Sequence, residues 1–499
     1  MKRRNAWNMV KEADGPLKKV AGAKFVLALL ALATLCVCAL AQENTTEYWI
    51  DRADESMNNG SIEGAVSAYD EALKIDPDNT TILIHKALEL SVLGRVNESS
   101  ETYERALSLL DETLLKDPND AKAWQWKATV LGSMNRQNES LAAYEKTLEA
   151  FNRRIETDSK DADAWVGKGN SLMNLGKWEE ARDAYNRAIE IDPQDYHTWG
   201  RKAEVIGRIG DLNESVEAYD RTIELIPSGN TQELSGYWMS KAEVLAIRGL
   251  SDDGPRTDLL EEALTAINHS LELDPKSSSK WHFKATILSE LGRKDEAVEA
   301  FDEGLRLNPE NADNWLWKAN LLVEMKRYNE SLEAYDKAIE LIAENNSEDL
   351  ALDWFSKGWA LNKTGRTDEA KAAFQKSLEF YETVISKNTG NIRLLQQKGL
   401  VLFELGRYDE AIEAYDQILK KSLSLEFDTT AVSAWIGKGD SLRLQGKNED
   451  ALVAYNKAID LGPHYSNAWH GRGEAQKAMG QVGNAGLSFL VADKLGYEE

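Results

Sequence analysis

Side chains that commonly carry out chemistry are few and scattered in this sequence of 499 residues. It contains no H-E-x-x-H, no G-x-S-x-G and no phosphate-binding G-x-x-x-x-G-K-[ST] motif. Gly167-Lys-Gly169 and Gly437-Lys-Gly439 resemble nucleotide-binding loops only faintly, because no strand is predicted before either. The histidines have no metal-ligand spacing: His85, His197, His269, His282, His464 and His470. We therefore expect no catalytic residues, no metal site and no cofactor, and a protein that is not an enzyme.

Charge and cysteine content exclude further classes. The chain has 84 acidic and 59 basic residues, a net charge of −25. Nucleic-acid binding needs basic surfaces that neutralise phosphates, so we expect no nucleic-acid partner. Two cysteines cannot form a disulfide framework or a cysteine-based zinc site.

Residues 1–41 form a separate predicted segment. Seven bases and two acids occupy residues 1–24, and an unbroken apolar run extends from Phe25 to Ala41. Its end, Ala39-Leu40-Ala41, has the small residues of a signal-peptidase site, so the segment is typical of a secretory signal peptide. An uncleaved signal anchor is the alternative, with residues 25–41 as a membrane tether of about 26 Å. In either case we expect the rest of the chain to be exported, extracellular or at the cell surface.

One pattern occupies the rest of the chain. In residues 162–195, residue types that recur elsewhere in the chain stand at positions 4, 8, 11, 15, 20, 24, 27 and 32: Trp165, Gly169, Leu172, Gly176, Ala181, Tyr185, Ala188 and Pro193. This pattern resembles the tetratricopeptide repeat, a helix–turn–helix unit of about 34 residues. The same frame gives twelve repeats, which begin at Thr46, Thr80, Ala121, Ala162, Tyr196, Ser235, Ser278, Ala312, Ala351, Ile392, Val432 and Ser466.

The resemblance implies an all-α fold, a right-handed superhelical solenoid of about twelve helix-turn-helix repeats. We divide it into residues 46–234 (repeats 1–5), residues 235–277 (repeat 6 with a loop insertion) and residues 278–499 (repeats 7–12). Extra residues in the repeats from Thr80, Ala121, Ala351 and Ile392 predict lengthened second helices. Residues 250–258 are rich in turn formers and predict a loop between the two helices of repeat 6.

The resemblance also implies that first helices line a groove that holds a protein or peptide. Large side chains gather at its expected positions, mostly in the middle repeats, and we call them the groove patch: Trp126, His282, Phe283, Leu316, Trp317, Phe355 and Trp359. Such side chains suit peptide anchors, with packing between first helices as the alternative. Position 5 is never lysine, which argues against the family's clamp for a C-terminal carboxylate.

These features predict an exported, non-enzymatic scaffold for protein or peptide partners at the cell surface. Two alternatives remain open. One is a carbohydrate-binding or envelope-structural protein that uses the same aromatic side chains. The other is a non-catalytic subunit of an envelope enzyme complex.

Position 7 is basic in all twelve repeats, from Arg52 to Arg472. It follows position 4, usually tryptophan, by three residues, so its aliphatic stem can lie along the indole. We expect a structural series that pairs with neighbouring acids, and a track for polyanions is the alternative.

Two further surface features are predicted. Asn-Glu-Ser sequons stand at positions 18–20 of four repeats, where we expect the asparagine to cap the second helix and to be a candidate glycosylation site: Asn97, Asn138, Asn213 and Asn329. The last repeat has apolar residues at outward positions, Leu487, Leu490 and Val491, which predict a docking face for a partner or for a homodimer.

Overall fold

The computed structural model describes residues 45–58, 60–250, 254, 256–342, 347–387, 391–422 and 429–497. The predicted signal peptide or anchor, residues 1–41, lies outside the described residues. Among the helices that are described, none is both long enough and apolar enough to cross a membrane.

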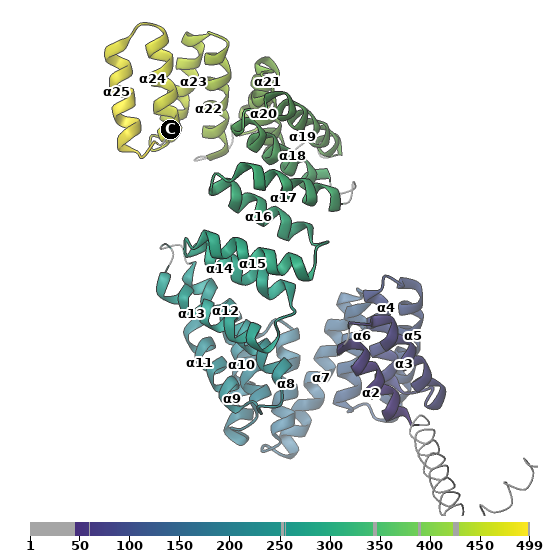
Figure 1. Ribbon diagram of the computed structural model, residues 1–499. Coiled ribbons are helices and arrows are strands. Elements are labelled where there is room, and N and C mark those ends of the chain that lie inside the picture. The colour runs from purple at the N-terminus through teal and green to yellow at the C-terminus, as the bar shows by residue number, and fades with distance from the viewer. Residues whose placement is uncertain are drawn as a thin grey trace, which may run out of the picture. The chain divides into compact units, whose positions relative to one another are not determined.

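Every regular element in the described ranges is an α-helix, labelled α2 to α25 (Figure 1). The chain divides into two compact units, at Pro227 and Ser228. The first contains α2 (Thr46–Asn58), α3 (Ile62–Ile75), α4 (Thr80–Val92), α5 (Val96–Lys116), α6 (Ala121–Ser133), α7 (Gln137–Thr157), α8 (Ala162–Asn174), α9 (Trp178–Ile191), α10 (Tyr196–Ile209) and α11 (Leu212–Leu225).

The second unit contains α12 (Thr231–Gly249), α13 (Thr257–Leu273), α14 (Ser278–Glu290), α15 (Lys294–Leu307), α16 (Ala312–Glu324), α17 (Tyr328–Leu341), α18 (Ser347–Lys363), α19 (Thr367–Lys387), α20 (Ile392–Glu404), α21 (Tyr408–Ser422), α22 (Thr429–Leu444), α23 (Asn448–Leu461), α24 (Ser466–Ala478) and α25 (Val482–Lys494). Within each unit every helix packs on the next, and the helices pair into one hairpin per predicted repeat. The predicted all-α repeat solenoid is confirmed.

The turn inside every hairpin except that of repeat 6 has a left-handed residue at position 15. Gly176 has φ 71° and Gly406 has φ 72°, a conformation that glycine adopts without steric cost. Asn135 and Lys326 adopt φ 60° at the same position of their repeats. In repeat 6 this turn is not used, because α12 continues through Gly249 and the predicted loop follows, partly outside the described residues.

An aromatic ring at position 24 joins each of several repeats to the next. A Cβ on Gly399, in the same repeat, would lie 2.7 Å from the Tyr415 ring, and one on Gly437, in the next repeat, would lie 2.5 Å from it. Tyr455 is held in the same way between Gly439, at 2.8 Å, and Gly471, at 2.4 Å. The ring therefore lies against two helix backbones, and only glycine leaves room for it there.

Three of the four predicted helix extensions are confirmed, since α5, α7 and α19 each have 21 residues. The prediction for the repeat from Ile392 is not tested, because α21, Tyr408–Ser422, is followed by residues 423–428, which lie outside the described residues. Part of the extra length of this repeat lengthens α22, where the added turn buries Ala431.

Candidate binding surfaces

Trp317 is the exposed member of the groove patch. Its side chain on α16 is 53% exposed, and its ring centroid lies 6.0 Å from that of His282 on α14. His282 also contacts Phe301, at 5.5 Å, and burial lowers the pKa of its imidazole, so the ring is neutral at pH 7. An exposed indole edge therefore lies beside an uncharged ring that belongs to the first helix of the preceding repeat.

The other members of the patch are partly buried in packing contacts. Leu316 and Phe355 pack against the core of the second unit, with Phe355 at 5.6 Å from Phe374. Trp359 lies 6.1 Å from Tyr328 and holds the Lys363 ammonium 4.9 Å from its ring.

Two predicted patch members stand apart from this cluster. Phe283 is partly buried on α14. Trp126, on α6 in the first unit, contacts His85 at 6.1 Å. The structure thus brings His282 and Trp317 together, while Trp126 belongs to a different compact unit. That the patch binds a partner stays a prediction.

The polar residue at position 9 orients the tyrosine at position 24. Tyr335 Oη donates to Asn320 Oδ1 at 2.6 Å, and Tyr185 Oη donates to Asn170 Oδ1 at 2.7 Å. Tyr455 makes the same contact to Asp440, at 2.6 Å. Both position-9 asparagines therefore stabilise the fold, because their side-chain carbonyl oxygens accept a hydrogen bond from the tyrosine.

The basic residues at position 7 form the predicted structural series. In nine repeats the cation lies 4.1–5.5 Å from the centroid of the position-4 indole: Lys127, Lys168, Lys202, Lys241, Lys284, Lys318, Lys357, Lys438 and Arg472. Several also pair with an acid on the preceding second helix, such as Lys318 with Asp302 at 2.5 Å and Lys438 with Asp416 at 2.6 Å. These cations are already paired, which argues against the polyanion track.

The position-4 tryptophan has a second role that the sequence analysis missed. In six repeats its Nε1 donates, at 2.8–3.1 Å, to the carbonyl oxygen six residues earlier, in the turn between repeats: Trp124, Trp165, Trp199, Trp281, Trp315 and Trp469. This hydrogen bond thus stabilises the turn that precedes the helix of the tryptophan. In the sequence, the feature that indicates this hydrogen bond is the proline that stands six residues before the tryptophan in most of these repeats.

Arginine at position 16 forms a two-pronged ion pair with glutamate at position 19. Arg327 donates from Nε and Nη2 to Glu330, at 2.7 and 2.6 Å, and Arg407 does the same to Glu410. This bond raises the pKa of Arg327 and lowers that of Glu330. In the sequence, the feature that indicates this ion pair is an arginine followed three residues later by a glutamate at the start of the second helix.

The four sequon asparagines are exposed, but they are not helix caps. The helices begin one residue earlier, at Val96, Gln137, Leu212 and Tyr328, so each asparagine is the second helical residue. The cause is the tight turn, in which position 15 is left-handed and position 16 already caps the helix. The serine of each sequon is buried, and Ser99 Oγ donates to Ala87 O at 2.7 Å.

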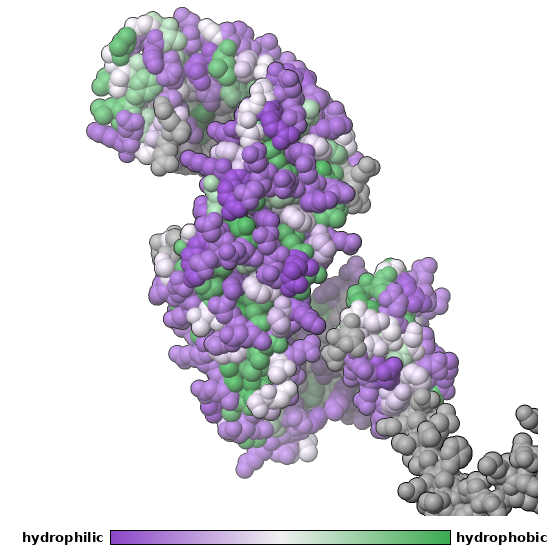
Figure 2. Space-filling model, viewed as in Figure 1, coloured by the Kyte–Doolittle hydropathy of each residue, from purple (hydrophilic) through white to green (hydrophobic). Residues whose placement is uncertain are grey.

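The predicted docking face of the last repeat lies on α25. Leu487 is 64% exposed and Leu490 is 50% exposed, with Val491 partly buried beside them. Figure 2 shows an apolar patch over this helix, at the upper left. Tyr497 stacks on His470 with centroids 3.9 Å apart, so the end of the described chain covers the first helix of this repeat and leaves α25 open.

Asp353 is a buried acid that the sequence analysis did not single out. Its side chain on α18 is 6% exposed, and Oδ2 has no hydrogen-bond partner within the described residues. Burial, with the charges of Asp349 and Asp313, raises its pKa to about 7. At the same position of the preceding repeat stands Asn314, 2% exposed. A neutral side chain therefore fits this place.

The raised pKa of Asp353 predicts that the protein loses stability as the pH rises from about 4 to about 7. The unfolded chain releases this proton near pH 4 and the folded chain near pH 7, so ionisation favours unfolding by about 2–4 kcal/mol at pH 8. Asp353→Asn should flatten the dependence of the thermal midpoint on pH between 5 and 8. The exposed Asp163→Asn is the control, and an unchanged slope in Asp353→Asn would contradict the assignment.

The described residues hold no group of three or more His, Cys, Asp or Glu side chains placed to bind a metal ion.

Comparisons with known proteins agree with this architecture. Four family models described as tetratricopeptide repeat together match just over half of the chain, at residues 46–79, 162–195, 281–311, 311–383 and 397–486. Human tetratricopeptide repeat protein 7A is 29% identical over 101 residues, and protein 7B is 26% identical over 101. That match spans 20% of this chain and 11% of either relative.

Solved structures of low sequence identity were also found. A tetratricopeptide repeat protein from Parabacteroides merdae is 17% identical, with a TM-score of 0.40 over 57% of this chain and 99% of that one. Yeast Tom70 is 14% identical, with a TM-score of 0.34 over 91% of this chain and 99% of that one. The family models and the twelve hairpins together establish that the chain belongs to the tetratricopeptide repeat family.

Proposed function

We propose that this protein is a non-enzymatic scaffold that binds a protein or peptide partner through the first helices of its second unit. The observation that carries the proposal is the exposed indole of Trp317 beside the neutral ring of His282. Tryptophan is among the side chains that contribute most to binding at protein interfaces. Membership of a repeat family supports the class of function, and it does not identify the partner.

The surroundings of Trp317 favour a partner with an apolar anchor and a neighbouring base. Asp313 is exposed one turn earlier on α16, and Asn320 is exposed one turn later. The position-7 cation nearby, Lys318, is bound to Asp302 at 2.5 Å and is not available to an acidic partner. The open part of the patch therefore combines an aromatic contact with negative charge.

Trp317→Ala tests this proposal with little damage to the fold, because the side chain is mostly exposed. A displayed peptide library is selected on the wild-type protein, and calorimetry then measures the affinity of the dominant peptides. Loss of a central aromatic anchor costs about 2 kcal/mol, so we expect at least roughly tenfold weaker binding to the variant.

Leu115→Ala is the matched control, because Leu115 is 83% exposed on a second helix of the other unit. It should bind the peptides as the wild type does. Dominant peptides that bind Trp317→Ala with wild-type affinity would refute the groove patch as the binding surface. Phe355→Ala is a poorer probe, since that ring packs against Phe374 in the core.

We also propose that the protein is exported and glycosylated. The support is the basic and apolar character of residues 1–41, together with the exposure of Asn97, Asn138, Asn213 and Asn329. Intact mass of the protein from its native source distinguishes the cases. A chain that begins at Gln42 indicates cleavage, a longer one indicates an anchor, and a bare-chain mass rules out glycans.

A homodimer through the last repeat is our proposal for the exposed face of α25. Its support is Leu490 and Val491, at positions that are polar in the eleven preceding repeats, with the exposed Leu487 beside them. Leu490→Lys with Val491→Lys introduces charge that two apposed faces cannot solvate, so the assembly should fall to monomers in light scattering. A wild-type protein that is already monomeric at high concentration would exclude the dimer.

A further inference from the structure

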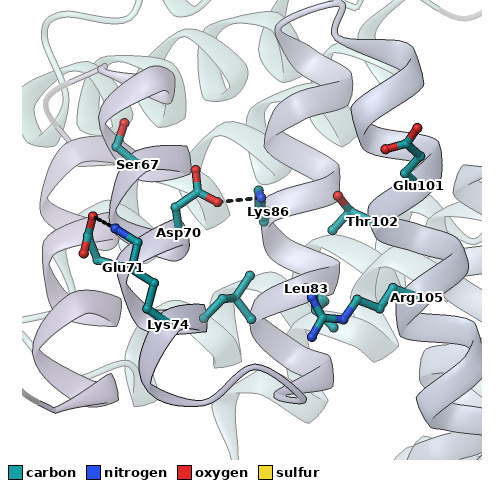
Figure 3. A pocket seen from close by; sticks show the side chains of 10 residues that line it. Ser67, Asp70, Glu71, Lys74, Leu83, Lys86, Glu101, Thr102 and Arg105 are labelled. Carbon is teal, nitrogen blue, oxygen red and sulfur yellow. Dashed lines mark hydrogen bonds and ion pairs between the residues drawn. The ribbon is translucent and has the colours of Figure 1, made fainter.

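A cavity of about 750 Å³ opens between the second helices α3 and α5 in the first unit. Leu83 and Lys86 of α4 line it in the middle, with Asp70 on the α3 side and Thr102 and Arg105 on the α5 side (Figure 3). It is separate from the groove patch, none of whose residues line it. We call it the Leu83 cavity.

An equivalent cavity in the second unit is smaller. It lies between α17 and α19, and it is lined by residues at several of the same repeat positions, including Trp354, Lys357 and Asp336. Its volume is about 400 Å³. In both places a second helix of 14 residues is followed by one of 21 residues. The marked difference at the centre is position 4, which is tryptophan in the smaller cavity and leucine in the larger.

The other repeats show how this place is normally filled. The position-4 indole lies beside the position-7 cation, and in six repeats it also donates its N–H to the carbonyl of the inter-repeat turn. The corresponding partners for Leu83 are Lys86, which lines the cavity, and the carbonyl oxygen of Pro77, six residues before Leu83, which bonds to the lining residue Arg105. The carbonyl oxygen accepts instead from Arg105 Nη2, at 2.7 Å. The position-7 cation and the turn carbonyl that contact an indole in other repeats are therefore present here, and the residue at position 4 is a leucine.

We propose that the Leu83 cavity binds a tryptophan side chain presented by a partner peptide or protein. The ring would occupy the space that position 4 leaves open, beside Lys86, and its N–H would replace Arg105 at the Pro77 oxygen. The Arg105 side chain is 50% exposed, so it can move aside into solvent at little cost.

The charges around the cavity argue against an anionic ligand. Lys86 is paired with Asp70 at 2.5 Å, and Lys74 is paired with Glu71 at 2.5 Å. Arg105 contacts Asp78 at 3.4 Å in addition to Pro77. A flat, neutral ring with one N–H donor fits the volume and leaves the Lys86–Asp70 and Lys74–Glu71 pairs intact.

N-acetyl-5-fluoro-L-tryptophanamide is the probe, because its ¹⁹F signal is free of the protein's own tryptophans. Relaxation of that signal should show saturable binding to the full chain. Leu83→Trp fills the cavity from α4 and should weaken binding at least tenfold, as should Thr102→Phe, which fills it from α5. The matching phenylalanine probe lacks the N–H donor and should bind several-fold more weakly than the tryptophan probe.

Val92→Trp adds an indole at an exposed site on the same helix and should bind the probe as the wild type does. Trp317→Ala should also retain binding, which separates this site from the groove patch. Circular dichroism checks that each variant is folded. The proposal is overturned by a wild-type protein without saturable binding at millimolar probe, by binding that survives in both filled variants, or by binding lost in Trp317→Ala.

Discussion

An aromatic ring pressed between two helix backbones is the contact on which the stacking of this protein depends. Tyr415 and Tyr455 each lie against a glycine of their own repeat and a glycine of the next, and both rings are almost completely buried. A single hairpin offers only one of these two surfaces, so its ring stays half covered until the next hairpin is in place. Each repeat is therefore stable only as part of its unit.

A second, polar layer follows the same spacing on the outside of the hairpins. The position-7 cation contacts the position-4 indole of its own helix and an acid of the preceding second helix, as Lys318 does with Trp315 and Asp302. Exposed ion pairs of this kind contribute little singly, about 0–1 kcal/mol each. Their constant geometry nevertheless limits how one hairpin can rotate on the next. In this strongly negative chain, the basic side chains at position 7 therefore stabilise the contact between neighbouring hairpins.

The candidate sites arise where one repeat departs from the others. Trp317 places a large ring on the open side of a first helix, Asp353 places an acid where the preceding repeat has an asparagine, and Leu83 omits an indole that other repeats supply. Each departure leaves something unsatisfied: an exposed apolar edge, an unpaired carboxylate oxygen or an unfilled volume. In a repeat protein such positions are informative because the neighbouring repeats show the satisfied form.

The sequence by itself determined the repeat, its frame, the left-handed turn at position 15 and the series of bases, because these depend on residue types at short, regular spacing. It did not determine the true caps of the second helices or the arginine–glutamate pairs, which depend on how tightly the turns close. Only the tertiary structure separated Trp317 from Phe355 and Leu316, since burial depends on what the neighbouring hairpin covers. Only the tertiary structure revealed the Leu83 cavity, because residues from several helices form its walls and no single residue type in the sequence indicates it.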